Sequence, residues 1–444
     1  MSGLPTGWAA CQLSDIGQIV TGKTPSTKES RFYGGDIPFI KPGDLDFASP
    51  IFRTETYLTA DGAAEIPSLP SQSIVVTCIG NLGKVGLTTT TSATNQQINA
   101  IIPHERIDPK FLFHYCKTLK PWLEAKSSAT TISIVNKGIF STAPTSLPPL
   151  AEQTRIAAKL DELLAQVDTL KARVDGIPAL LKRFRQSVLA AAVSGRLTEE
   201  WRKDDSSKYK DLDFAYPVNR LGLLARFIDY RGKTPEKVGT GIPLITAKNI
   251  RSGYISREPR EFIRPEAYEG WMTRGIPLVG DVLITTEAPL GNIAVIDITE
   301  KFALAQRAIC LQFHEGFLSN FGAIALQSPL LQEELLRRAT GTTVKGIKAS
   351  VLKDIEVPVP TLAEQTEIVS RVEQLFAFAD QLETRVKIAQ TRIDRLTQSI
   401  LAKAFRGELV PQDPNDEPAS VLLERIKAQR AAAPKTKRGR KASA

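Results

Sequence analysis

The chain has 444 residues, of which 42% are hydrophobic and 24% are charged, an ordinary composition for a soluble protein with two or more domains. It has no apolar run long enough to cross a membrane, its first residues do not resemble a signal peptide, and its four cysteines form no CxxC pair, so we expect a cytoplasmic protein with reduced thiols and no membrane partner. The formal net charge is +9, but residues 425–444 hold eight Lys or Arg and no acid, so the excess belongs to a basic tail.

Residues 1–149 have the turn residues and apolar stretches of a strand-rich domain. The segment 34–45 predicts a strand between turns, and 73–89 predicts a β-hairpin around a Gly/Asn turn. A short amphipathic helix is expected around 109–120. The nearest approach to a metal-ligand set lacks a second closely spaced pair, so we predict no metal site; its members are His104, His114 and Cys116.

Two long helices of nearly the same sequence are predicted at 150–197 and 361–412. Apolar residues in each recur at alternating steps of four and three, which is the seam of a coiled coil. The seam residues are Ile156, Leu160, Leu163, Val167, Leu170 and Val174 in the first helix, and Ile368, Val372, Leu375, Leu382, Val386 and Ile393 in the second. We expect Gly176-Ile177-Pro178 to kink or break the first helix, because proline removes a helix hydrogen bond. Thr361 and Glu364 match a capping box at the start of the second helix.

Residues 198–360 repeat the themes of residues 1–149 in the same order. TGKTP at 21–25 returns as RGKTP at 231–235, for example. Residues 413–444 are predicted to be a short helix and a basic tail. The sequence therefore predicts an α+β protein with an internal duplication: two similar mixed α/β domains separated by an antiparallel coiled coil of the two helices, with a pseudo-two-fold relation. The alternative is a coiled coil between separate chains.

Residues 17–24 match the phosphate-loop pattern G-x-x-x-x-G-K-[ST]. Pro25 follows at once, no apolar helix begins after it, and the repeat has Phe227 in place of the first glycine. We therefore interpret GKTP as a turn in both copies, with Lys23 and Lys233 available to DNA phosphate. A nucleotide hydrolase that uses Lys23 is the enzyme alternative.

The pattern P-x-L-x-E-Q stands ahead of both long helices, as PPLAEQ at 148–153 and PTLAEQ at 360–365. With QSVLAAAVSGRL at 186–197 and QSILAKAFRGEL at 398–409, it resembles the specificity subunit of type I restriction–modification enzymes. The resemblance covers residues 1 to about 430. A structural adaptor with a duplicated coiled-coil scaffold that does not touch DNA is the alternative.

The resemblance implies two target-recognition domains, each of which reads one part of a bipartite, gapped sequence in double-stranded DNA. It implies helices that set the spacing and dock two methyltransferase subunits, and a complex that restriction/translocase subunits join. S-adenosylmethionine, ATP and Mg are expected in those partner subunits. This chain itself is expected to hold no cofactor and to catalyse nothing, since no motif for amino methylation, for S-adenosylmethionine binding or for a metal-dependent nuclease is found.

Candidate DNA contacts follow from residue type, because Arg or Lys suits guanine, Asn or Gln suits adenine, and basic side chains hold phosphate. Those in or beside predicted loops of the first domain are Lys23, Lys41, Asn81, Lys84, Gln96, Gln97, Asn136 and Lys137. Those of the second domain are Arg231, Lys233, Lys248, Asn249, Arg251, Asn292, Gln306, Arg307, Lys345 and Lys348. Gln96 and Gln306 recur at matching places, so a shared structural hydrogen bond competes with base contact there.

Overall fold

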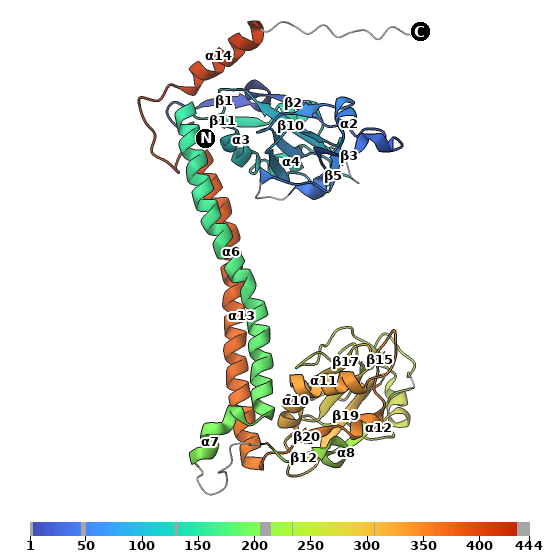
Figure 1. Cartoon of the computed structure of the whole chain (residues 1–444). Coiled ribbons are helices and arrows are strands. Elements are labelled where there is room, and N and C mark those ends of the chain that lie inside the picture. The colour runs from blue at the N-terminus through green and yellow to red at the C-terminus, as the bar shows by residue number, and fades with distance from the viewer. Residues whose placement is uncertain are drawn as a thin grey trace. The chain divides into compact units, whose positions relative to one another are not determined.

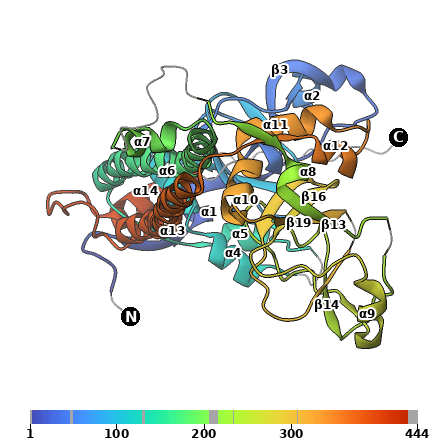
Figure 2. The ribbon, with the colours of Figure 1, turned by 90° about the horizontal axis from the view of Figure 1, so that it is seen from below.

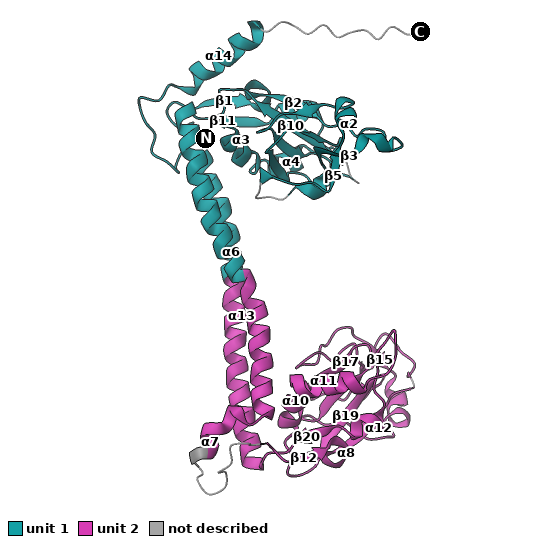
Figure 3. Cartoon of the chain, viewed as in Figure 1, with its two compact units in different colours: residues 1–174, 389–444 teal, residues 175–388 magenta. Residues whose placement is uncertain are grey.

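The computed structural model describes residues 3–45, 50–128, 132–204, 215–232, 234–305 and 307–432. The chain divides into two compact units (Figure 3): unit 1 holds residues 1–174 and 389–444, and unit 2 holds residues 175–388. No helix in the described ranges has both the length and the apolarity needed to span a membrane.

Unit 1 contains three sheets, with strand orders β1-β11, β2-β10-β7-β8-β4 and β5-β3-β9-β6. Its strands are β1 (Ala9–Gln12), β2 (Gly17–Thr21), β3 (Tyr33–Ile40), β4 (Pro50–Ile51), β5 (Thr56–Leu58), β6 (Ser68–Leu69), β7 (Ile74–Thr77), β8 (Val85–Thr88), β9 (Ser92–Thr94), β10 (Ile98–Pro103) and β11 (Pro144–Leu147). Its short helices are α1 (Leu13–Ile16), η1 (Ser30–Phe32), η2 (Pro42–Asp44), α2 (Ala60–Ala64), α3 (Pro109–Cys116), α4 (Lys120–Lys126), α5 (Lys137–Ser141) and α14 (Ala419–Ala432). The predicted hairpin at 73–89 is confirmed as antiparallel β7 and β8.

Unit 2 has the sheets β12-β20, β13-β19-β16-β17 and β15-β14-β18. Its strands are β12 (Val218–Arg220), β13 (Ala225–Asp229), β14 (Ile242–Ile245), β15 (Phe262–Ile263), β16 (Val282–Thr286), β17 (Leu290–Val295), β18 (Ala303–Leu304), β19 (Ala308–Phe313) and β20 (Glu356–Pro358). Its short helices are η3 (Arg196–Thr198), α7 (Glu199–Asp204), α8 (Leu221–Leu224), η4 (Pro265–Ala267), α9 (Tyr268–Trp271), α10 (Ser319–Gln327), α11 (Pro329–Arg338) and α12 (Ala349–Lys353).

The two units share one topology. The order β2-β10-β7-β8 in unit 1 matches β13-β19-β16-β17 in unit 2, and β1-β11 matches β12-β20. Even the parallel pair β3 and β9, which is unusual among mainly antiparallel neighbours, returns as the parallel pair β14 and β18. The predicted duplication of a mixed α/β domain is therefore confirmed at the level of strand order and direction.

The long helices are α6 (Leu150–Val193) and α13 (Leu362–Phe405), and the boundary between the units divides each of them into a unit 1 part and a unit 2 part. They lie side by side in both views (Figures 1 and 2). Within unit 1 Lys171 pairs with Asp394 at 2.9 Å, and within unit 2 Arg185 pairs with Glu383 at 3.3 Å. The partner number falls as the α6 number rises, so the expected antiparallel pairing is confirmed within one chain.

Most seam residues are buried or half-buried, but Leu170 is 48% exposed, and that assignment is wrong. At this level Lys171 and Asp394 bridge the two helices with an ion pair. The buried seam residues near the helix starts are covered by more than the other helix. Ile156 and Leu160 join one core with Phe111 of α3, and Ile368 and Val372 join another with α10. The seams thus fasten each domain to the helix pair as well as pairing the helices.

Of the two outcomes expected at Gly176-Ile177-Pro178, a kink or a break, the break is not observed, because α6 continues through Pro178. A proline inside a helix costs about 3 kcal/mol, because it removes one hydrogen bond and clashes with the preceding turn. Val167 before it and Leu181 after it are both buried. Burial on either side of the proline stabilises the continuous helix.

Candidate nucleic-acid interface

Four loops of unit 1 meet at one edge of its five-stranded sheet, and we call them the first loop cluster: residues 21–24, 78–84, 94–97 and 132–137. Backbone hydrogen bonds join neighbouring loops. The Lys23 N–H donates to Thr94 O at 2.9 Å, the Cys78 N–H donates to Gln97 O at 2.8 Å, and the Val135 N–H donates to Cys78 O at 2.8 Å. Asn99 of β10 adds a side-chain bond from Nδ2 to Val135 O at 3.3 Å. The loops therefore form one surface on a rigid frame.

Unit 2 repeats this frame in the second loop cluster, made of residues 230–232, 286–292, 307 and 340–348. The Thr286 N–H donates to Arg307 O at 2.8 Å, and the Ile347 N–H donates to Thr286 O at 2.9 Å. The Ile347 carbonyl, which matches that of Val135, accepts from Arg231 Nη1 at 3.2 Å. The same backbone frame thus carries different side chains in the two units.

The candidates of the first domain divide by exposure. Lys23, Asn81, Gln96, Asn136 and Lys137 are exposed, whereas the other three are half-buried. Those three are tied to their own domain: Lys41 Nζ donates to Thr56 Oγ1 at 2.8 Å, Lys84 Nζ donates to Pro42 O at 3.2 Å, and Gln97 Oε1 accepts from Asn95 Nδ2 at 2.9 Å.

Two exposed candidates also have local partners. Gln96 Oε1 accepts from the Thr24 hydroxyl at 2.6 Å, and Asn136 caps α5 by accepting from the Ile139 N–H at 2.9 Å. The Thr24–Gln96 bond joins loop 21–24 to loop 94–97, so Lys23 and Gln96 lie in adjacent loops.

In the second domain Lys248, Arg251, Arg307, Lys345 and Lys348 are exposed. Arg307 has φ of 61°, a left-handed conformation that a non-glycine residue rarely adopts and that is common at functional sites. Its Nε lies 2.9 Å from Glu287 Oε1. Lys233 and Gln306 lie outside the described residues.

The half-buried candidates of the second domain hold its loops together. Arg231 donates from Nε and Nη2 to the two oxygens of Asp229 at 2.8 and 2.7 Å. Burial pushes the pKa of Asp229 upward, but these bonds outweigh it and hold that pKa below its ordinary value. Asn292 Nδ2 donates to Ile250 O at 2.8 Å.

The prediction that Asn249 contacts DNA is wrong. Asn249 is 1% exposed, its Oδ1 accepts from Thr246, and its Nδ2 donates to Ser256 O and Pro259 O at 3.1 Å each. Because every polar atom of the amide is used inside its own loop, Asn249 braces that loop and offers nothing to a base.

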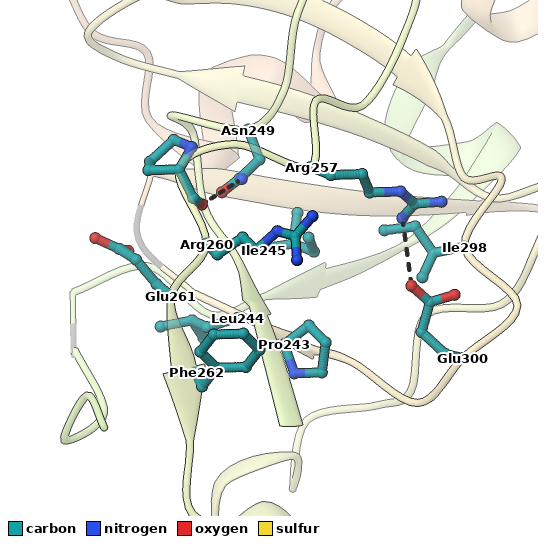
Figure 4. Close-up of a pocket in the computed structure, with 11 residues that line it drawn as sticks. Pro243, Leu244, Ile245, Asn249, Arg257, Arg260, Glu261, Phe262, Ile298 and Glu300 are labelled. Atoms are coloured by element: carbon teal, nitrogen blue, oxygen red, sulfur yellow. Dashed lines mark hydrogen bonds and ion pairs between the residues drawn. The ribbon is translucent and has the colours of Figure 1, made fainter. Parts of the chain in front are cut away.

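Two hollows of unit 2 adjoin candidate residues. One has a volume of 290 Å³ in the second loop cluster and is lined by polar groups of Arg231, Glu287, Thr340 and Lys348 among others. The other has a volume of 280 Å³ and adjoins Asn249. Figure 4 shows its apolar wall of Pro243 and Phe262 beside Arg257, Arg260, Glu261 and Glu300.

The charged side chains around the hollow that adjoins Asn249 largely neutralise one another. Lys237 lies 2.9 Å and Lys248 3.5 Å from the Glu261 carboxylate. Burial raises the pKa of Glu261, but the two lysines outweigh it, so that pKa lies below its ordinary value. Arg257 faces Glu300 at 3.8 Å. In the hollow of the second loop cluster Glu287 likewise pairs with Arg307, and the exposed Lys348 adds a positive charge there.

The phosphate-loop alternative conflicts with the local structure. Gly17–Thr21 is strand β2, paired in register with β10, and the next helical element is η1 at Ser30–Phe32. A phosphate loop wraps its glycines and lysine around the N-terminus of a following helix, which this segment lacks. Among the side chains that the structure describes, no three His, Cys, Asp or Glu residues converge in a way that could hold a metal ion.

The Glu-Gln dipeptides at the starts of α6 and α13 are buried polar sites whose contacts the sequence did not reveal. Glu152, Gln153, Glu364 and Gln365 are each at most 1% exposed. The expected capping box is only half formed. The Glu364 N–H donates to Thr361 Oγ1 at 3.3 Å, but the Glu364 carboxylate binds Arg202, Tyr216 and Thr198 instead of the Thr361 N–H. The repeated letters LAEQ were the available signal.

Two copies of one α+β domain, each displaying polar loops on a rigid frame and each fastened to an antiparallel helix pair, define the class of a duplicated recognition protein. The chain belongs to the family of the type I restriction modification DNA specificity domain, whose family model matches residues 5–179 and 233–390.

Curated relatives match along nearly their whole length. The type I restriction enzyme EcoKI specificity subunit of Escherichia coli strain K12 is 31% identical, with 99% of each chain covered. The EcoBI specificity subunit of Escherichia coli is 33% identical over 98% of this chain and 94% of its own. Among solved structures, the HsdS subunit from Thermoanaerobacter tengcongensis shares the fold with a TM-score of 0.59 at 20% identity, over 91% of this chain and 98% of its own. A chain from the type I R-M system, solved to explain complex assembly and conformational transition, has a TM-score of 0.72 at 21% identity over 92% of this chain and 100% of its own.

Proposed function

We propose that this chain is the DNA sequence-specificity subunit of a type I restriction–modification complex, and that its two domains read the two parts of a gapped target in double-stranded DNA. The observation that carries the proposal is the pair of loop clusters. Two of their backbone hydrogen bonds recur at matching places, from Cys78 and Thr286 and from Val135 and Ile347, while the side chains on them differ. Two domains that read different short DNA sequences need the same backbone frame with different side chains on it.

The exchanged side chains predict two unlike half-sites. Gln97 and Arg307 hold matching places, since the carbonyl of each accepts the corresponding strand-end N–H. Asn136 and Lys348 also match, as the residues that precede α5 and α12. Amide side chains suit adenine, whereas Arg and Lys suit guanine or phosphate. The second domain therefore brings more positive charge to its half-site than the first does.

We propose that the long helices set the spacing between the two half-sites. Each has 44 residues, which corresponds to about 66 Å at 1.5 Å per residue. That length is of the order of two turns of B-DNA at ~34–36 Å each. Antiparallel pairing of α6 with α13 supports readers that approach the DNA in opposite orientation.

Partner subunits dock on the helices in this proposal. The exposed large apolar side chains among the described residues of the long helices are Leu150, Leu170 and Leu396 in unit 1 and Leu180, Leu362, Phe378 and Ile388 in unit 2. Exposed apolar side chains on a charged helix surface favour protein contacts. Each half of the helix pair thus offers a surface to one methyltransferase subunit, and restriction/translocase subunits join that core. S-adenosylmethionine, ATP and Mg belong to those partners, and this chain performs no catalytic step.

Binding by the complex of this chain with its methyltransferase partner tests the proposal. Fluorescence anisotropy on a gapped target should show selective binding that Gln96→Ala/Gln97→Ala changes at the first half-site only, and Lys345→Ala/Lys348→Ala at the second only. Removal of one side chain that reads a base should weaken binding about 5- to 150-fold. Lys159→Ala, on an exposed face of α6 where Lys159 pairs with Glu162, is the matched control.

The rival, a structural adaptor that does not touch DNA, predicts that none of these variants changes selectivity. Equal binding to the gapped target and to random DNA, unaltered by either pair of substitutions, would favour the adaptor and reject the proposal.

A further inference from the structure

The Gln153 side chain joins the first turn of α6 to the recognition domain of unit 1. It is fully buried. Its Oε1 accepts from the Asp108 N–H at 3.0 Å, and its Nε2 donates to Pro148 O at 2.9 Å. Asp108 is the N-cap of α3, so a helix of the domain and the long helix meet at this amide.

Gln365 makes the same connection in unit 2. Its Oε1 accepts from the Leu318 N–H at 2.7 Å, and its Nε2 donates to Pro360 O at 3.0 Å and Gly316 O at 3.3 Å. Leu318 is the N-cap of α10. Two fully buried amides with the same pair of partners in two copies are better explained by a shared positional role than by chance packing.

The neighbouring glutamates bind the segment that leads into the first strand of each domain. Glu152 Oε2 accepts from Trp8 Nε1 at 3.0 Å, and Trp8 stands just before β1. Glu364 Oε1 accepts from the Tyr216 hydroxyl at 2.7 Å, and Tyr216 stands just before β12. Each Glu-Gln dipeptide therefore fixes its domain at two places, the chain entry and the first helix after the sheet.

A continuous path of packed elements leads from the dipeptide to the candidate DNA surface. In unit 1, α3 packs on β7 and β8, whose turn carries Asn81 and Lys84. In unit 2, α10 packs on β16 and β17, whose turn leads to Asn292. A change in how α3 or α10 sits on the long helix would therefore move the loops that face DNA.

We propose that Gln153 and Gln365 are positioning residues that set the orientation of each recognition domain on its helix, and thereby the gap length that the complex accepts. This rests on the proposed function. One base pair changes the separation of the half-sites by ~3.4 Å and their rotation by ~34–36°. A domain fixed to its helix at two places cannot adjust to either change, whereas a domain that can rotate on its helix can adjust to both.

The test measures binding of the chain, in complex with its methyltransferase partner, to targets with the native gap and with gaps one base pair shorter or longer. Gln153→Met and Gln365→Met keep the side-chain length and remove the two hydrogen bonds of Gln153 and the three of Gln365. The ratio of affinities for the native gap and the altered gaps should fall about fivefold, comparable with the effect of one mismatched base pair. Gln166→Met and Gln374→Met, at exposed glutamines that bond only within their own helix, should leave the ratio unchanged.

Gln153→Glu separates positioning from fold stability. Burial next to Glu152 and the Pro148 carbonyl favours the protonated carboxyl, which can accept from the Asp108 N–H and donate to Pro148 O as the amide does. The variant should retain the wild-type gap ratio; if Gln153→Met does not fold, Gln365→Met makes the same comparison in unit 2, where a fall in the ratio supports the positioning role and an unchanged ratio rejects it.

A uniform loss of affinity at every gap, with the ratio unchanged in the Met variants or reduced equally in Gln153→Glu, would overturn the positioning role. If the wild-type complex itself shows no preference for a gapped target, the proposed function fails, and the positioning role falls with it.

Discussion

The buried ion pair of Arg202 and Glu364 allows a stability change to be worked out from the structure. The Arg202 side chain is 5% exposed and that of Glu364 is 1% exposed. Arg202→Met keeps most of the aliphatic volume but leaves the carboxylate with only the Tyr216 and Thr198 hydroxyls, each at 2.7 Å, among the bonds described above. Removing one partner of a buried pair costs about 3–5 kcal/mol.

Differential scanning calorimetry measures this cost. For a body the size of unit 2, residues 175–388, each kcal/mol lowers Tm by about 2–4 °C, so the unit 2 transition should fall by about 6–20 °C. Arg220→Met is the control, because the Arg220–Asp354 pair is 65% and 58% exposed and such pairs contribute about 0–1 kcal/mol. Adding Glu364→Gln to Arg202→Met should recover much of the loss, since the buried charge is then gone. A fall no larger than that of Arg220→Met would refute the reasoning.

Three further predictions concern burial. Leu160→Ala should lower the free energy of unfolding in urea by about 2–5 kcal/mol, because Leu160 is fully buried. Leu170→Ala, at an exposed position, should change that free energy by about 0.5 kcal/mol or less. Equal effects of the two substitutions would contradict the burial pattern. Burial lowers the pKa of His114 to about 4 from 6.5. The unfolded chain therefore takes up the proton first, and stability should fall as pH drops from about 6.5 to about 4. His114→Gln should flatten that part of the pH profile of stability, and an unchanged slope would reject the prediction. Burial raises the pKa of the Cys78 thiol to about 11 and that of Cys11 to about 12. Ellman's reagent at neutral pH should therefore react with the native chain far more slowly than with the urea-unfolded chain. Equal rates would count against the packing around these two cysteines.

The duplication could be predicted from the sequence because it rests on local patterns. Seam positions repeat with a fixed period, and the turns return in order, so α6, α13, their antiparallel pairing and the β7–β8 hairpin followed from residue spacing. Leu170 fits the same period but is exposed, because periodicity does not say what lies opposite a given turn. Pro178 signalled a break that burial on both sides of it prevents.

Long-range polar contacts could not be predicted. Thr361 and Glu364 have the spacing of a capping box, but the carboxylate binds Arg202, which lies 162 residues away in the chain. Asn249 has the residue type of a base reader, and only its hydrogen bonds to Thr246, Ser256 and Pro259 show that its amide is already used. A residue type common to base readout and loop bracing cannot be assigned without the fold.

The most direct test of the central claim, two readers on one chain, is a map of methylated bases in DNA from cells that carry this chain with its methyltransferase partner. We predict a single bipartite motif: two unlike short blocks with a fixed gap, of which Gln96→Ala/Gln97→Ala alters one block and Lys345→Ala/Lys348→Ala the other. A continuous motif, or a bipartite motif in which both pairs of substitutions alter the same block, would contradict it.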